Sequence, residues 1–330
     1  MIATAQRTDA EWMAATVRLA ARARPISRPN PGVAALIVRN DRIIARGWTQ
    51  DGGRPHAEAQ ALEALGGRNT ASGATIYVTL EPCAHQSERG PSCADLLVEA
   101  QPERVVIGQG DPDPRTAGAG IERLKQAGIA VDVLGDAGAR QSLSGYFAAK
   151  ETERPYVTLK LAMSLDGCIA LADGTSQWIT GATSRAHVHA QRARNDAILV
   201  GGGTWRADNP RLDVRLPGLE RRSPSRVLLT RGVAPDGVKI INRPDQIGAL
   251  DSVQYLYVEG GAETAASFLK EDLVDELHLY QTPIMIGDGL RALGALDLAS
   301  LDEAHGRWLR LEHRQLGSDT FESYQRIRSV

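Results

Sequence analysis

Three residues in the first half of the chain have the types and spacing of a catalytic zinc site. They are His56, Cys83 and Cys93, and Glu58 lies two positions after the histidine. One imidazole and two thiolates leave the fourth position of tetrahedral zinc open for water, whereas a structural site normally closes its shell with four protein ligands. A histidine followed by a glutamate, with a later Pro-Cys pair, is the signature of hydrolytic zinc deaminases, which remove an exocyclic amine from a nucleobase-like ring.

The elements expected around these residues would bring them to one point. They are a helix over 56–65, a strand over 75–80 that ends just before Pro82-Cys83, and a helix over 93–99 with Ser92 as its N-cap. His56, Glu58 and Cys93 would then lie in first turns of helices, where backbone N–H groups and the helix dipole favour a metal-binding thiolate. The alternative for Glu58 is a carboxylate that only stabilises its helix, and an isolated His-x-Glu also occurs by chance.

Composition narrows the class of protein. The chain has only three cysteines, and this sparse, odd number disfavours a disulfide framework and indicates the cytoplasm, as does an N-terminus without an apolar export signal. We expect the third, Cys168, to be a small buried side chain. No stretch approaches the ~20 apolar residues of a membrane span. A net charge of −2, with 38 basic and 40 acidic residues well mixed, argues against a nucleic-acid partner and permits a small phosphorylated one.

A length of 330 residues predicts two domains. The charged stretch 149–155 ends in proline and marks the boundary, which gives domains 1–150 and 151–330. In the first, a capping box at Thr8–Glu11 begins an amphipathic helix, and the alternation of helices with strands predicts an α/β layer fold. In the second, two strands run into glycines that open helices, and such junctions either direct backbone N–H groups at phosphate or are simply tight connections.

Three stretches of the first domain, together with Pro29-Asn30-Pro31, resemble the deaminase half of the bifunctional RibD family of riboflavin biosynthesis. They are residues 53–58, 77–85 and 111–114. The resemblance implies a cytidine-deaminase-like α/β/α layer domain that binds Zn²⁺. It further implies the following roles: zinc ligands His56, Cys83 and Cys93, proton shuttle Glu58, and pyrimidine contact Asn30.

The second domain resembles the reductase half of the same family in residues 157–167, 176–180, 208–212 and 258–261. The resemblance implies a dihydrofolate-reductase-like α/β fold and NADPH as cofactor. The implied cofactor contacts are Ala162, Trp178, Thr204, Asp208, Gly260 and Gly261. The implied substrate contacts are Ser176, Arg192, Leu212, Arg215 and Glu259.

The residue types suit these roles, and each also has a simpler alternative. Arg192 and Arg215 can hold a phosphate as charge-assisted donors, and Glu259 can accept hydrogen bonds from sugar hydroxyls. Arg192 could instead lie on the solvated face of a helix, and Trp178 could be ordinary core packing. His85, two positions after Cys83, either contacts substrate or lines its loop, and both interpretations stay open.

The resemblance covers about residues 8–325 and implies two successive reactions. The first domain would deaminate 2,5-diamino-6-ribosylamino-4(3H)-pyrimidinone 5′-phosphate, and the second would use NADPH to give 5-amino-6-ribitylaminouracil 5′-phosphate. The alternative is a zinc deaminase with a shortened, catalytically inactive reductase-like domain. We expect a small phosphorylated pyrimidine substrate, no nucleic acid and no membrane. We also expect a homo-oligomer, although an apolar segment such as 279–286 can be either a subunit contact or a buried strand.

The chain departs from the family pattern in four places. Cys83 and Cys93 enclose nine residues, one more than is usual, Thr49 replaces a common histidine, and Ala34 replaces a glycine. The fourth departure is the short segment between residues 226 and 258, where the family has a further strand–helix pair. We predict a loop over 232–251, with Arg231 as a candidate contact for the cofactor's 2′-phosphate.

Overall fold

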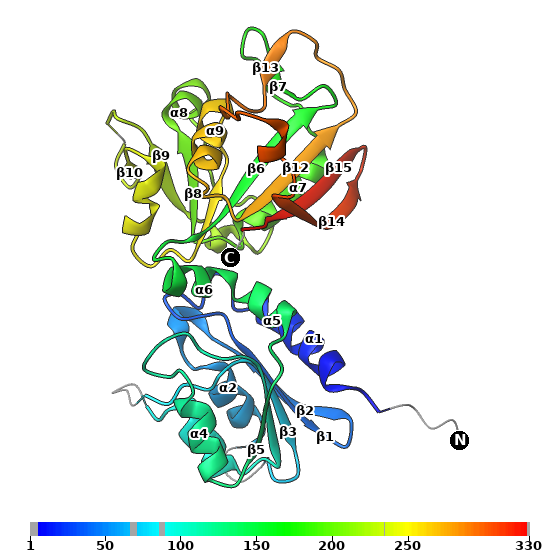
Figure 1. The fold of residues 1–330 in the computed structure, drawn as a ribbon, viewed down its shortest axis with the longest axis vertical. Helices are drawn as coiled ribbons and strands as arrows, with labels where there is room; N and C mark the ends of the chain where they lie inside the picture. Colours follow the sequence, from blue (N-terminus) through cyan, green and yellow to red (C-terminus); the bar gives the residue numbers. More distant parts are fainter. Residues whose placement is uncertain (1–5, 67–70, 86–89, 234, 329–330) are drawn as a thin grey trace, which may run out of the picture. The chain divides into compact units, whose positions relative to one another are not determined.

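The chain forms two compact units, Met1–Glu153 and Arg154–Val330, each with its own hydrophobic core (Figure 1). The structure is a computed structural model, and it describes residues 6–66, 71–85, 90–233 and 235–328. Within these ranges, none of the helices combines the length and the apolar character that crossing a bilayer requires.

A five-stranded mixed sheet with the order β2-β1-β3-β4-β5 forms the centre of the first unit. Strand β1 is antiparallel to both β2 and β3, whereas β3, β4 and β5 are parallel. The strands are β1 (Ala34–Arg39), β2 (Arg42–Trp48), β3 (Thr75–Leu80), β4 (Arg104–Gln109) and β5 (Ala130–Val133). The helices are α1 (Asp9–Ala20), α2 (Ala57–Ala64), α3 (Cys93–Ala100), α4 (Ala119–Gln126), α5 (Ala137–Ser142) and α6 (Ser144–Glu151), with a 3₁₀ turn η1 (Asp51–Gly53).

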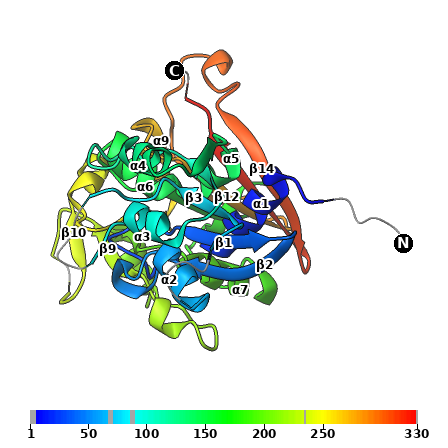
Figure 2. The ribbon, with the colours of Figure 1, turned by 90° about the horizontal axis from the view of Figure 1, so that it is seen from below.

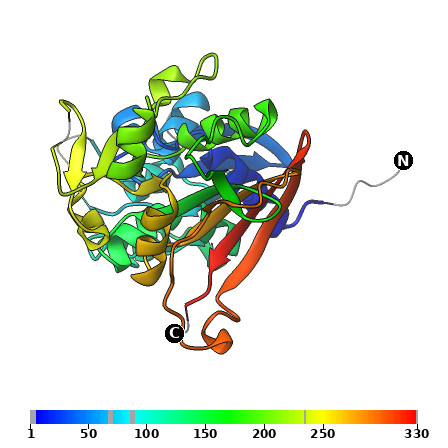
Figure 3. The same ribbon diagram turned by 90° about the horizontal axis from the view of Figure 1, so that it is seen from above.

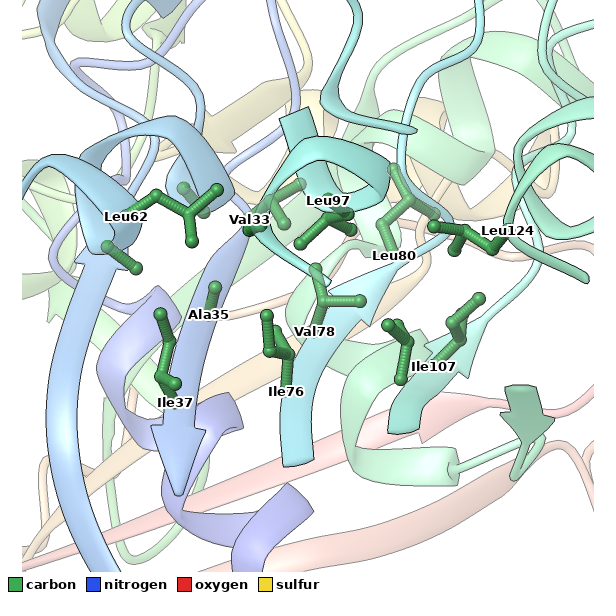
Figure 4. Close-up of a cluster of buried hydrophobic side chains, with 14 of the residues drawn as sticks. Val33, Ala35, Ile37, Leu62, Ile76, Val78, Leu80, Leu97, Ile107 and Leu124 are labelled. Carbon is green, nitrogen blue, oxygen red and sulfur yellow. The ribbon is translucent and has the colours of Figure 1, made fainter. Parts of the chain in front are cut away.

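Helices cover both faces of this sheet. On one face, α2, α3 and α4 supply Leu62, Leu97 and Leu124 to a core with the strand residues Ile76 and Ile107 (Figure 4). Figure 2 shows α2 and α3 beside β1 and β3. On the other face, a second core contains residues of α1 and α5 and the opposite side chains of the same strands, namely Trp12, Met13, Ala139, Leu36, Val38, Tyr77 and Val106. The predicted α/β/α layers are therefore confirmed, because strands buried on both faces need a cover on each.

Local sequence signals begin two of these helices, α1 and α3, where they were predicted. The hydroxyl of Thr8 accepts a hydrogen bond from the backbone N–H of Glu11 at 3.3 Å, and the Glu11 carboxylate accepts one from the N–H of Thr8 at 2.8 Å. The hydroxyl of Ser92 likewise accepts a hydrogen bond from the N–H of Asp95 at 3.1 Å, which begins α3. These contacts satisfy N–H groups that have no partner within a helix.

The second unit is built on an eight-stranded sheet with the order β10-β9-β8-β11-β6-β12-β15-β14. Neighbouring strands from β10 to β12 are parallel, and the antiparallel hairpin β14–β15 forms the other edge, drawn in orange and red in Figure 3. These strands are β6 (Tyr156–Ser164), β8 (Ala197–Gly201), β9 (Ser225–Leu229), β10 (Lys239–Ile241), β11 (Tyr255–Val258), β12 (Glu276–Thr282), β14 (Trp308–Leu316) and β15 (Asp319–Arg326). The helices are α7 (Ala182–Arg192), α8 (Gly202–Asp208) and α9 (Ala262–Lys270), and β7 (Cys168–Leu171) pairs with β13 (Gly289–Arg291).

Two interpretations of the second domain are settled by this sheet. Cys168 is fully buried, as expected. The apolar segment 279–286 begins within β12, which pairs with β6 on one side and β15 on the other. Its first half is therefore a strand inside the sheet of one chain.

The prediction of a loop over 232–251 is wrong. The segment contains strand β10, which pairs in parallel with β9, and the 3₁₀ helix η3 (Pro244–Ala249). Ile241, Ile247 and Leu250 are buried in the same core as β8 and β11. A strand of three residues is too short to show a recognisable alternation of apolar and polar residues, so the shortened segment concealed a small strand–helix pair.

His187 gives the second domain a pH-dependent stability. Its Nδ1 lies 2.9 Å from the Tyr280 hydroxyl, and its ring packs edge-on against Phe321 at 4.6 Å between centroids. Burial lowers the pKa of His187 to about 4, below the usual 6.5, so the folded state binds fewer protons than the unfolded state. The stabilising contribution is therefore present above pH 6.5 and is lost as the pH falls towards 4.

We accordingly expect the free energy of local unfolding of this sheet to fall by about 1–2 kcal/mol between pH 7 and pH 4.5. This magnitude allows for partial screening of His187 by solvent. His187→Gln should remove this portion of the pH dependence. Amide hydrogen exchange of α7 and β12 measures it within one domain, where a single unfolding temperature for the whole chain would not. An unchanged slope in the variant would show that other groups cause the pH dependence.

Candidate active sites

Four strand ends of the first unit meet at one edge of its sheet. The first residue of β1, Ala34, pairs with the last residue of β2, Trp48, and β3 and β4 both end at this edge. Loops that leave these strands line a cavity of about 280 Å³, as do His56 and Glu58 at the start of α2. An edge where several strands end is a usual place for a ligand in an α/β fold.

The three predicted metal ligands converge beside this cavity. The ligand atoms of His56, Cys83 and Cys93 all lie within 4.8 Å of one another. Nδ1 of His56 is 3.3 Å from the Cys93 sulfur and 3.6 Å from the Cys83 sulfur, and the backbone N–H of Cys93 donates to the Cys83 sulfur at 3.3 Å. The hydrogen bond from Cys93 and the His56 ring lower the pKa of Cys83 well below that of a free thiol. A nitrogen and two sulfurs in this arrangement fit Zn²⁺ with one position left open.

Glu58 lies in the first turn of α2, is only 4% exposed and lines the same cavity as His56 and Cys83. Burial raises the pKa of its carboxyl group, which brings the group closer to a balance between its neutral and charged forms. A carboxyl group so placed can both accept and return a proton. Its position in the cavity favours the predicted proton shuttle over a carboxylate that only stabilises its helix.

Asn30 also reaches the metal ligands. Its amide nitrogen donates to the carbonyl of Gly53 at 2.9 Å and lies 3.2 Å from Nε2 of His56. Gly53 has a φ of 87°, and a Cβ there would lie 2.7 Å from the Asn30 nitrogen, so this close approach requires glycine. Asn30 thus holds the imidazole from the side opposite the sulfurs while it lines the cavity.

Two further residues that line the cavity, His85 and Thr49, had roles that the sequence left open. Within the described part of the chain, the buried Nδ1 of His85 has no hydrogen-bond partner, and the residue lines the cavity, which favours a substrate contact. Thr49, in place of the common histidine, accepts a hydrogen bond from the N–H of Val33 at 3.1 Å and also lines the cavity. The expected bulge between Cys83 and Cys93 includes residues 86–89, which lie outside the described ranges.

Sequence reasoning missed Glu81, which organises the loop opposite the metal ligands. Its buried carboxylate accepts hydrogen bonds from four backbone N–H groups, at 3.2, 3.1, 3.0 and 3.3 Å. The donors are Asp111, Gly118, Gly120 and Ile121. Because Glu81 directly precedes Pro82-Cys83, one side chain fixes both a metal-ligand loop and the start of α4. The only signal in the sequence is an acidic residue at the end of an apolar strand.

We expect Glu81→Gln to destabilise the first domain by about 1–3 kcal/mol. The carboxylate accepts the four hydrogen bonds with two oxygens, whereas the amide of glutamine has only one oxygen acceptor. Deamination should also slow, since the loop and the adjacent cysteine lose a shared anchor. Denaturant unfolding and deamination rates measure the two effects, and Glu63→Gln on the exposed face of α2 is the matched control. A Glu81→Gln protein as stable and active as the Glu63→Gln protein would refute this role.

A second cavity, of about 540 Å³, lies in the second unit at the carboxyl ends of β8 and β11. All the residues predicted to contact cofactor or substrate in this domain line it. They are Ala162, Ser176, Trp178, Arg192, Thr204, Asp208, Leu212, Arg215, Glu259, Gly260 and Gly261. Residues from distant positions between Ala162 and Gly261 thus come together in one site, whereas Arg231 is not part of its lining.

A buried ion pair lies in this cavity. The guanidinium of Arg192 donates to Glu259 through Nε at 2.6 Å and Nη2 at 2.9 Å, and both side chains are only 11–12% exposed. The alternative of a solvated helix face for Arg192 is therefore wrong. Lys160, which the sequence analysis left without a role, lies 3.9 Å from Glu259, and burial lowers its pKa. Burial by itself would raise the pKa of Glu259, but the charge of Arg192 outweighs this effect. The pKa is therefore lowered, and the carboxylate stays ionised.

Trp178 and Gly260 show how the cavity is shaped. Trp178 is 64% exposed and lies under the guanidinium of Arg185 at 4.9 Å, so the alternative of core packing is wrong. A Cβ at Gly260 would lie 2.4 Å from the Cβ of Thr264. Glycine therefore lets the chain turn closely from β11 into α9, and this leaves backbone N–H groups available at the helix start.

The two units together define a two-domain α/β enzyme, in which a zinc-dependent hydrolase site precedes a glycine-turn cavity suited to a dinucleotide. Residues 6–109 match the cytidine and deoxycytidylate deaminase zinc-binding region, and residues 155–321 match the RibD C-terminal domain. The chain belongs to the RibD family of riboflavin biosynthesis proteins.

Relatives match over both domains. Riboflavin biosynthesis protein RibD of Escherichia coli is 36% identical, with 87% of this chain and 91% of the relative covered. That of Corynebacterium ammoniagenes is 41% identical, with 82% and 84% covered. The solved structure of Acinetobacter baumannii RibD has a TM-score of 0.85 at 34% identity, covering 97% of this chain and 99% of that one. A deaminase/reductase from Thermotoga maritima has a TM-score of 0.84 at 29% identity, covering 96% and 98%.

These findings establish the general function. The chain is a bifunctional enzyme of riboflavin biosynthesis, with a zinc-dependent deaminase domain and an NADPH-dependent reductase domain. The alternative of an inactive reductase-like remnant is not favoured, because the second domain matches its family model from residue 155 to residue 321.

Proposed function

We propose that the first domain deaminates 2,5-diamino-6-ribosylamino-4(3H)-pyrimidinone 5′-phosphate and that the second reduces the ribosyl group of the product to ribityl. The convergence of His56, Cys83 and Cys93 within 4.8 Å beside the buried Glu58 is the observation that carries the first step. The Thermotoga relative is described as a diaminohydroxyphosphoribosylaminopyrimidine deaminase and 5-amino-6-(5-phosphoribosylamino)uracil reductase, which supports both steps.

In the first site, Zn²⁺ held by His56, Cys83 and Cys93 would supply a Lewis acid that makes water reactive at neutral pH. Glu58 takes a proton from the attacking water and delivers it to the ring nitrogen of the pyrimidine. The same carboxyl group then takes the remaining proton of the added hydroxyl and gives it to the departing amine, so that a C–O bond replaces the C–N bond and the amine leaves as ammonia. Asn30 orients the imidazole and contacts the pyrimidine, and burial keeps bulk water away from Glu58.

In the second site, NADPH would supply the hydride. We assign cofactor binding to Ala162, Trp178, Thr204, Asp208, Gly260 and Gly261. We assign substrate binding to Ser176, Arg192, Leu212, Arg215 and Glu259. Arg192 and Glu259 fix one another, so that a sugar hydroxyl and an anionic group meet partners already in position. Leu212 has a φ of 56° and lines the same cavity as Arg215.

We also propose a cytoplasmic location and a homo-oligomeric state. The three cysteines are free thiols, two of them are metal ligands in our assignment, and a reducing compartment preserves such ligands. Light scattering of the purified protein tests the oligomeric state, and a mass equal to a single chain would refute that part.

Turnover of the diaminopyrimidine phosphate by the zinc-loaded protein tests the central proposal. Without NADPH, mass spectrometry should show one amine replaced by oxygen. With NADPH, the product should gain two further hydrogens while an equal amount of cofactor is oxidised. Deamination without any oxidation of NADPH would refute the second step, and an unchanged substrate would refute the first.

A further inference from the structure

The deaminase cavity contains cations that the deamination chemistry does not use. Arg54, Arg115 and Lys150 all line it. Arg54 precedes the metal ligand His56 by two residues and belongs to the metal end of the cavity. Arg115 and Lys150 come from other elements, the loop that follows β4 and the helix α6. The cavity therefore has a second cationic region, separate in the chain from the metal ligands.

A single carboxylate holds these two cations together. Asp113 accepts hydrogen bonds from Nε and Nη2 of Arg115 at 3.0 and 2.7 Å, and from Nζ of Lys150 at 2.8 Å. The Asp113 side chain is 7% exposed, whereas those of Arg115 and Lys150 are 66% and 38% exposed. The two cations hold the pKa of Asp113 well below its usual range, so the carboxylate stays charged. Two cations thus share one buried carboxylate, while the neighbouring Asp111 accepts from the Tyr146 hydroxyl and the backbone N–H of Asp113.

The arrangement has unused donors. Nη1 of Arg115 makes no hydrogen bond to any residue that the structure describes, and Lys150 uses one of its three N–H donors on Asp113. One cation would be enough to neutralise Asp113, and a second at the same carboxylate adds repulsion between like charges. An anion bound to both cations would offset this repulsion, because it attracts each of them. The adjoining Tyr146 on α6 donates to Asp111 at 2.7 Å, which fixes the helix that carries Lys150.

We propose that Arg115 and Lys150, held in place by Asp113, bind the 5′-phosphate of the substrate in the deaminase cavity. This inference rests on the proposed function and adds the basis of substrate selection to it. A phosphate accepts charge-assisted hydrogen bonds from a guanidinium and an ammonium group. The first domain therefore selects the phosphorylated pyrimidine riboside over its dephosphorylated form, independently of the phosphate contacts in the reductase domain.

Deamination of both forms without NADPH tests the proposal, with the ratio of their kcat/KM values as the readout. We expect Arg115→Gln and Lys150→Gln each to reduce the preference for the phosphorylated form by about 10-fold, and the double variant by about 100-fold. Activity on the dephosphorylated form should stay unchanged in all three. Arg115→Lys and Lys150→Arg, which keep the charge, should retain most of the preference.

Arg140→Gln is the matched control. Arg140 forms an ion pair with Glu151, which lies on the same helix as Lys150, but Arg140 does not line the cavity. Arg140→Gln should keep the full preference. A wild-type enzyme without any preference for the phosphorylated form would overturn the subsite but leave the deaminase assignment intact, as would an unchanged preference in the double variant. A wild-type enzyme that deaminates neither form would overturn the proposed function instead. If a variant loses activity on both forms equally, the two cations act on the fold and the proposal is refuted.

Discussion

Replacing Glu58 with glutamine is expected to lower kcat for deamination by about 10³-fold, because the amide can neither take the proton of water nor return one to the leaving amine. Glu58 is buried and similar in shape to glutamine, so the fold and the metal site should persist. Reduction of the deaminated intermediate by NADPH should proceed at the wild-type rate, since the second domain has its own core and cavity.

Zinc content and both rates should be measured on the same preparation. Glu63→Gln, on the exposed face of the same helix, is the control and should retain full activity. If Glu58→Gln retained deamination above one-tenth of the wild-type rate with a full complement of zinc, another group would have to be the proton shuttle.

The second large effect is expected from Arg192→Met. Loss of the guanidinium leaves Glu259 with Lys160, at 3.9 Å, as its one ion-pair partner among the residues that the structure describes. Breaking a buried pair in this way costs about 3–5 kcal/mol of stability. Reductase kcat/KM should fall by about 10²-fold or more, because the proposed charge-assisted contact of Arg192 to substrate is removed as well. Deamination should be unaffected.

A second variant separates these two causes. Arg192→Met combined with Glu259→Gln removes both charges, so it should recover much of the stability without recovering reductase activity. Arg243→Met breaks an exposed arginine–aspartate pair in the same domain, and it should change neither property. Recovery of reduction in the double variant would show that the pair is structural only.

Most elements of the fold could be predicted because their signals are local. The capping box at Thr8 and the N-cap at Ser92 each act within a few residues, and each lies where it was expected. The metal ligands could also be predicted, since the deaminase signature fixes which elements carry them. Their convergence follows from a mixed sheet in which β2, β3 and β4 all end at the edge where β1 begins.

The rest depends on contacts between distant segments. Glu81 is bonded to N–H groups 30 to 40 positions further along the chain, and no local pattern records this. Lys160 lies between two buried residues on β6. Its role can be recognised only in the structure, because Glu259 follows β11, the strand that pairs with β6. Strand β10 is short and obtains its stability from pairing with β9. Pairing and burial of this kind are properties of the assembled sheet.

The separate cores of the two units have a genetic consequence. We expect a chain disabled at Glu58 to supply a working reductase, and a chain disabled at Arg192 to supply a working deaminase. Two defective alleles of these kinds, expressed in one cell that depends on this gene, should therefore complement each other in trans and restore growth without added riboflavin. Such complementation requires the intermediate to leave one polypeptide and reach another.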